Sequence, residues 1–119
     1  MTLVDLYRLT LERLQVAAAG ESDEPEDVQG VAERYPLLYD MLLTKGLVAW
    51  GLTADVPAYA AQPLIDMLAY MCAGTFGKDP ALFAAQGALD LPTLSIAERQ
   101  LRMQLAKHVI PSRMRVEYF

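Results

Sequence analysis

The chain has 119 residues and a mass of 13.2 kDa, which is the size of one domain. It is 54% hydrophobic, yet no uncharged run is long enough to span a bilayer, so we expect no membrane association. The single cysteine excludes an internal disulfide and fits a reducing compartment. The first residues lack the basic region and cleavage site of a signal peptide, so cytoplasmic synthesis is expected.

The net charge of −5 is unevenly distributed. Residues 1–97 carry 5 basic and 13 acidic side chains, whereas residues 98–119 carry 5 basic and 2 acidic ones. General nucleic-acid binding needs a contiguous cationic face, which an acidic body does not offer. The split suits head-to-tail association of copies, in which a basic end meets an acidic surface. Chance drift in a short chain explains the same imbalance equally well.

The first helix is predicted over residues 3–19. Its apolar residues recur at steps of three and four and form one stripe of Leu3, Tyr7, Leu11, Leu14 and Ala18. Gly20 follows, and we expect it to end the helix in a left-handed cap.

An acidic segment comes next, containing Glu21, Asp23, Glu24, Glu26 and Asp27. Ser22 or Asp23 is predicted to cap the second helix, and Pro25 with the acids would form its first turn, where the dipole favours negative charge. A metal site is the alternative interpretation. However, a calcium loop needs alternating ligands, a central glycine and a distant glutamate, and the segment has no such pattern.

The second helix is predicted over residues 28–45 and ends at Gly46. Pro36 is expected to break or kink it near residues 34–35, because proline lacks the amide hydrogen that a helix needs.

Residues 47–59 show no helical period and predict an extended connector with room for a short strand. Trp50 and Tyr59 lie within it. Either they fix the connector to the core or they anchor an interface with another protein.

The third helix is predicted over residues 63–76, with Gly77 as its cap and a buried face of Leu64, Met67, Leu68, Met71 and Cys72. Asp79 followed by Pro80 is a helix-start signal and predicts a short helical segment through Ala85.

Residues 95–98 read Ser-Ile-Ala-Glu, a capping box that opens the last helix. This helix is predicted to run to about His108 and to be closed by Pro111. Its inner side is formed by Leu94, Leu101 and Leu105.

After Ile110 the spacing of the apolar residues changes from a helical period to strict alternation. Met114, Val116 and Tyr118 alternate with charged residues, which is a strand pattern, and Phe119 follows. In an otherwise helical chain such a strand has no partner, so it would stay loose or add to a sheet of another chain. The predicted fold is therefore all-α: a small bundle of four to five helices over residues 1–109, with an extended docking arm over residues 110–119.

Residues suited to catalysis or cofactor binding are scarce, and we expect neither enzyme activity nor a cofactor or metal site. His108 lies near a helix C-terminus and Cys72 in an apolar stripe, so we assign structural roles to both. No zinc-ligand spacing or glycine-rich phosphate loop is present. Methionine also serves adaptable interfaces, but we interpret four methionines as core residues: Met41, Met67, Met71 and Met103.

Several local motifs recur in one known family. Residues 9–21 end in a Val-x-Ala-x-Gly-Glu turn followed by the acidic cap, and the second helix ends in a Met-Leu stretch at residues 40–43. Residues 63–77 form a proline-led helix with a Leu-Ala-Tyr centre and a Phe-Gly end. In these features the chain resembles the head–tail connector adaptors of tailed bacteriophages, also called head-completion or packaged-DNA-stabilisation proteins. Pro36 and the long spacing from Gly20 to Met41 depart from the family pattern.

The resemblance implies a structural virion protein at the head–tail interface, made in the host cytoplasm. Such adaptors form a ring, commonly of twelve copies, beneath the portal protein. The ring extends the DNA channel, through which DNA passes without sequence-specific binding, and it offers a platform to the tail or neck protein.

The resemblance also gives the C-terminal arm a target, because the C-terminal segments of these adaptors attach to the portal. We expect Met114, Val116, Tyr118 and Phe119 to fill portal pockets, and Arg113 and Arg115 to pair with acidic groups. The candidate surface for subunit contacts or for the channel lumen consists of Glu21, Asp23, Glu24, Glu26, Asp27 and Trp50.

Two other functions remain open on the sequence. The chain could be a small helical regulatory or interaction module that forms a dimer and is unrelated to a portal. It could also be an enzyme that uses carboxylates, for which Asp23 and Asp27 are the best candidates.

Overall fold

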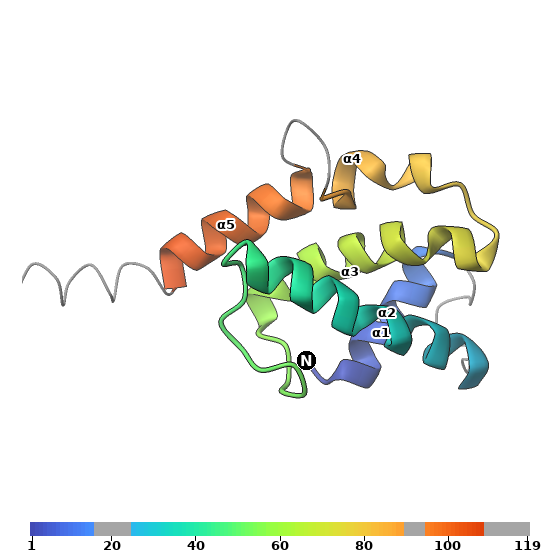
Figure 1. The fold of residues 1–119 in the computed structure, drawn as a ribbon, viewed down its shortest axis with the longest axis horizontal. Helices are drawn as coiled ribbons and strands as arrows, with labels where there is room; N and C mark the ends of the chain where they lie inside the picture. Colours follow the sequence, from blue (N-terminus) through green and yellow to red (C-terminus); the bar gives the residue numbers. More distant parts are fainter. Residues whose placement is uncertain (16–24, 90–94, 109–119) are drawn as a thin grey trace, which may run out of the picture.

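The computed structural model describes residues 1–15, 25–89 and 95–108 (Figure 1). Five α-helices and two short 3-10 turns follow one another, with no strand in these ranges. In chain order they are α1 (Leu3–Arg13), α2 (Pro25–Thr44), α3 (Ala58–Cys72), η1 (Ala73–Phe76), η2 (Pro80–Leu82), α4 (Ala84–Gly87) and α5 (Ile96–His108). The prediction of a small all-α bundle is confirmed.

Helix α3 is the centre of the bundle and packs against α1, α2, α4 and α5 (Figure 1). Every residue from Pro63 to Ala69 is buried, on all sides of the helix. A helix that is apolar all round is stable only inside a protein, because each face must be covered. The sequence of α3 therefore dictates its central place.

Helix α1 ends earlier than predicted. Tyr7, Leu11 and Leu14 are buried as the apolar stripe requires, but the last helical residue is Arg13. Leu14 caps the helix, and Gln15 takes the left-handed conformation with φ 61° that was expected of Gly20. The predicted continuation through residue 15 is wrong, and residues 16–20 lie outside the described ranges.

Helix α2 runs through Pro36 as one element, so the predicted break is wrong. Pro36 is exposed, whereas Val31, Tyr35, Leu38 and Leu42 are buried on the opposite side. Burial of that face on both sides of the proline offsets the loss of one backbone hydrogen bond.

Gly46 follows the end of α2 as predicted, whereas α3 ends at Cys72 and not at the predicted residue 76, and Gly77 caps the 3-10 turn η1 that follows α3. Gly46 has φ 72° and Gly77 has φ 73°, a left-handed conformation that costs glycine little. After Gly46, the Leu47 amide donates to the Leu42 carbonyl oxygen at 2.8 Å, and the Leu47 side chain is buried. The helix end is thus fixed by a backbone hydrogen bond together with an apolar contact.

The connector after α2 has no strand, but Val56 and Met1 exchange two backbone hydrogen bonds. The Val56 amide donates to the Met1 carbonyl oxygen at 2.8 Å, and the Met1 amino nitrogen donates to the Val56 carbonyl oxygen at 3.0 Å. These bonds tie the connector to the beginning of α1. Helix α3 then begins at Ala58, so Pro63 lies inside the helix, and the predicted start at Pro63 is wrong.

The segments η2 and α5 begin with the caps that the sequence predicts. The Asp79 carboxylate accepts the Ala81 amide at 3.0 Å, and the Ser95 hydroxyl accepts the Glu98 amide at 3.3 Å. Leu101 and Leu105 are buried as predicted. None of the described helices is long and apolar enough to cross a membrane.

Candidate interaction surface

The docking arm predicted over residues 110–119 lies outside the described residues. The same holds for its candidate contact residues, which are Arg113, Met114, Arg115, Val116, Tyr118 and Phe119. Helix α5 ends at His108, at one extremity of the body (Figure 1).

Of the five predicted surface acids, Glu26 and Asp27 are described, and both lie in the first turn of α2 as predicted. Their charges lie at the positive end of the helix dipole, which stabilises the turn. Glu21, Asp23 and Glu24 lie outside the described ranges. Within those ranges, no three His, Cys, Asp or Glu residues gather in a way that could hold a metal ion.

Trp50 fixes the connector to α2. Its indole Nε1 donates a hydrogen bond to the Tyr35 hydroxyl at 3.1 Å, and the Tyr39 hydroxyl donates to the Trp50 carbonyl oxygen at 2.6 Å. Burial raises the pKa of Tyr35, which keeps its hydroxyl protonated. This geometry supports the core-fixing interpretation of Trp50, and its role in an interface stays a prediction.

An apolar pocket of about 170 Å³ opens between α2, α3 and the segment that follows α4. It is lined by Met41, Tyr70, Met71, Gly87 and Leu89. Two of the methionines predicted as core residues thus line a pocket, while Met67 is fully buried as predicted. Flexible, polarisable methionine side chains suit a surface that accepts an apolar group.

The wall of the pocket on the α4 side depends on Gly87. A Cβ atom at this position would collide with the Asp66 carbonyl oxygen and lie 3.0 Å from the Met67 Cα. The backbone of α4 therefore lies directly on α3, and only glycine permits that approach. The pocket lies beside this close contact, because Gly87 also lines it.

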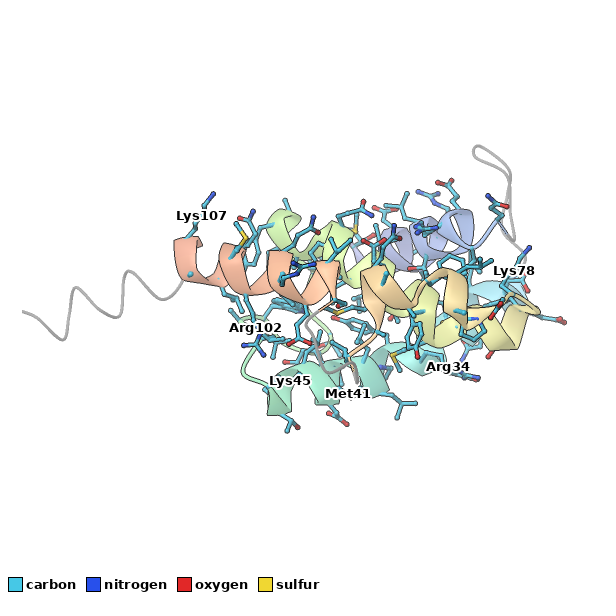
Figure 2. The ribbon with its side chains drawn as sticks, turned by 90° about the horizontal axis from the view of Figure 1, so that it is seen from above. Arg34, Met41, Lys45, Lys78, Arg102 and Lys107 are labelled. Carbon is cyan, nitrogen blue, oxygen red and sulfur yellow. The ribbon has the colours of Figure 1, made fainter. Side chains whose placement is uncertain are left out.

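Two basic residues flank Met41, which lines the pocket, along α2 and the turn after it. Figure 2 shows Arg34 and Lys45 on either side of Met41. At a rise of about 1.5 Å per residue, Arg34 lies about 10 Å from Met41 along the axis and Lys45 about 6 Å. Arg34 Nη2 donates to the Thr75 hydroxyl at 2.8 Å, which holds its guanidinium over η1.

Lys45 and Arg102 share one buried carboxylate, that of Glu98. Arg102 donates from Nη2 and Nε to Glu98 Oε2 at 2.9 and 3.1 Å, and Lys45 Nζ lies 3.9 Å from Oε1. The Glu98 side chain is only 1% exposed. Two cations facing one carboxylate leave a positive balance around Glu98.

A second buried carboxylate, Asp66, binds helix α1 to α3. Arg13 Nε lies 3.5 Å from Asp66 Oδ1, and Gln62 donates to the same oxygen at 3.3 Å. Arg13 also donates to Gln86 Oε1 and stacks 4.9 Å above the Phe83 ring. Burial raises the pKa of Asp66, and the Arg13 charge opposes that rise without cancelling it.

A shallow groove of about 270 Å³ lies between α3 and α5 and is lined by Tyr59, Gln62, Pro63, Gln100, Met103 and Gln104. Met103 is 61% exposed, so its assignment to the core is wrong. Its neighbours Leu101 and Leu105 fill the buried face, and residue 103 falls on the other side of the helix.

The described cysteine is inert. Cys72 is fully buried, and burial raises the pKa of its thiol to about 11. The reactive form, the thiolate, is therefore scarce at neutral pH, as the sequence interpretation expected. His108 is the last residue of α5, which places it at the helix end predicted for it.

Comparisons of the chain with protein-family models, with curated proteins and with solved structures found no match.

The sequence interpretation missed Asp66 as a structural residue, although a signal was present. Asp66 is the only charged residue between Val56 and Gly77, and it stands on the buried face of the third helix. Such an isolated acid predicts a buried partner. Glu98 was assigned to a capping box, and its spacing of four residues from Arg102 was the unused signal.

Proposed function

We propose that the chain is a structural virion protein, a head–tail connector adaptor that assembles as a ring under the portal of a tailed bacteriophage. The observation that carries this proposal is the family-like order of the helices, from the acidic cap of α2 to the proline-containing central helix α3. The all-α bundle is the fold such an adaptor needs.

The surface supports an assembly role. Large apolar side chains are exposed on several elements: Val4, Leu37, Leu43, Leu52, Leu82, Ile96 and Met103. Apolar exposure on several sides suits a subunit that contacts more than one neighbour. The ring would also contact the tail or neck protein and let DNA pass without sequence-specific binding.

The arm supplies the proposed portal contact. Helix α5, which precedes it in the sequence, ends at His108 at an extremity of the body (Figure 1). Its apolar residues would fill portal pockets, and Arg113 and Arg115 would fix the register by pairing with acidic groups.

The experiment is truncation after Ile110, followed by mixing with DNA-filled, portal-bearing heads. We expect the truncated chain to keep the helical circular-dichroism spectrum and melting temperature of the full chain, because the described helices end at His108. It should no longer sediment with the heads. Normal attachment of the truncated chain would show that the arm is not the docking element. A full-length chain that never attaches, and forms only a dimer, would favour the regulatory module.

A further inference from the structure

Leu82 is the most exposed large apolar side chain of the described residues, at 74%. The pocket lined by Met41 and Met71 is open and apolar on the same molecule. We propose that Leu82 of one copy inserts into this pocket of the next copy and that the chain associates with itself through this contact. The inference deepens the ring assembly proposed above and rests on it.

The turn that carries Leu82 is anchored on both sides. Asp79 caps η2 through the Ala81 amide, and Pro80 fixes its own φ angle. Phe83, the next residue, is buried beneath the Arg13 guanidinium. Leu82 is thus presented on a turn that is already ordered, which lowers the entropy cost of binding.

The pocket has the size for one side chain. Its volume of about 170 Å³ is close to the ~150 Å³ of an apolar cavity that holds benzene. It is smaller than the roughly 300–1,000 Å³ typical of cofactor and drug sites. A leucine side chain fits this volume and would bury its apolar surface against Met41, Met71 and Leu89.

Charge complementarity favours a second copy as the occupant. Arg34 and Lys45 lie on either side of Met41, one of the residues that line the pocket (Figure 2), in a chain with a net negative charge. Asp79 stands three residues before Leu82 and is exposed. Its carboxylate accepts one amide hydrogen bond and has lone pairs left for a guanidinium or ammonium group of the next copy.

The contact joins two different patches of the chain. Such a heterologous contact links copies head-to-tail and closes into a ring when the rotation permits. A reciprocal dimer, in which each copy fills the pocket of the other, is the competing geometry.

The test uses two single-cysteine additions, Leu82→Cys and Met41→Cys, mixed under mild oxidation. Cys72 is fully buried, so the native thiol should not form disulfides in this experiment. We expect a disulfide-linked mixed dimer from this pair. The control pair, Val4→Cys with Met41→Cys, places an equally accessible thiol on α1 and should give at least tenfold less product, since Val4 is 61% exposed.

Sedimentation of the wild-type chain and of Leu82→Ser completes the test. The wild type should form species larger than a dimer, and Leu82→Ser should weaken association by about 10-fold or more, through the loss of one buried leucine. Val4→Ser is the matched control and should associate normally. A wild type that stays monomeric, or forms only dimers, would overturn the proposal.

Failure of this contact is separable from failure of the adaptor function. If the mixed disulfide does not form but the chain still joins portal-bearing heads, the contact is wrong and the adaptor function stands. If the disulfide forms but the chain never joins heads, the contact stands as self-association and the adaptor function fails.

Discussion

Asp66 and Glu98 are both buried carboxylates, but the structure satisfies them in different ways. Glu98 finds Arg102 one turn later on its own helix, at 2.9 Å, and its pairing forms as soon as α5 forms. Asp66 depends on Arg13, which α1 brings to within 3.5 Å only when the bundle assembles. The nearest charged partner of Glu98 thus lies on its own helix, whereas the charged partner of Asp66 lies on another helix. The docking of α1 on α3 should therefore be the more vulnerable region.

Arg13→Ala should give the largest effect. It leaves Asp66 buried beside Gln62 alone and removes the stacking on Phe83, and we expect a loss of about 2–3 kcal/mol in unfolding free energy. Urea denaturation followed by circular dichroism measures the loss. Arg8→Ala is the matched control, since Arg8 and its partner Asp5 are each about half exposed, with 51% and 47% of their side-chain surface accessible. Equal losses for the two variants would contradict the comparison.

Glu98→Gln should give a smaller effect, of about 1–2 kcal/mol, because it weakens charge-assisted hydrogen bonds but leaves no charge buried. Arg102 and Lys45 are 43% and 34% exposed and can be hydrated in the variant. The same denaturation experiment measures the change. A loss larger than that of Arg13→Ala would reverse the ranking of the two regions.

Asp66→Asn should change stability least at neutral pH, by no more than about 1 kcal/mol, because it removes both a buried charge and its desolvation cost. The pH dependence of the stability difference between this variant and the wild type is more informative. Burial raises the pKa of Asp66 above its ordinary value of 3.8, so the native state binds this proton more tightly than the unfolded state. The contribution of Asp66 is therefore fully present below pH 3.8 and is lost as pH rises through the native pKa.

Thermal melts of the wild type and of Asp66→Asn between pH 3 and pH 7 test this sign. The wild type should lose stability relative to the variant as pH rises above 3.8. Asp40→Asn, a change at an exposed acid of α2, serves as the control for effects common to any lost carboxylate. If the wild type instead gained stability relative to Asp66→Asn as pH rises over this range, the Arg13 charge would affect the pKa of Asp66 more than burial does.

Local signals in the sequence predicted the helices well where one feature dominates. Gly46 follows the end of α2, Gly77 caps η1, and Asp79 and Ser95 cap η2 and α5, because these effects depend on a few neighbouring residues. The apolar periods predicted the burial of Leu64, Met67, Leu68 and Cys72 in α3 and of Leu101 and Leu105 in α5, but not the burial of α3 on all its sides.

The errors occurred where tertiary packing decided the outcome. Pro36 does not break α2, because the face around Tyr35 and Leu38 is packed into the core on both sides of it. Helix α1 ends at Arg13, where the side chain is held by Asp66 and Phe83, and no local signal marks that end. The pocket was not predicted, because Met41 and Gly87 come together only through the packing of α4 on α3.

The hydrogen bond between Trp50 and Tyr35 has a spectroscopic consequence. Trp50 is the only tryptophan of the chain, and its indole lies within hydrogen-bond distance of the middle ring of a row of tyrosines, Tyr7, Tyr35 and Tyr39. Excitation energy absorbed by these tyrosines will therefore be transferred to Trp50, and the fluorescence of Trp50 reports on the connector alone. The chain carries its own optical reporter, and release of the connector during unfolding can be followed without a label.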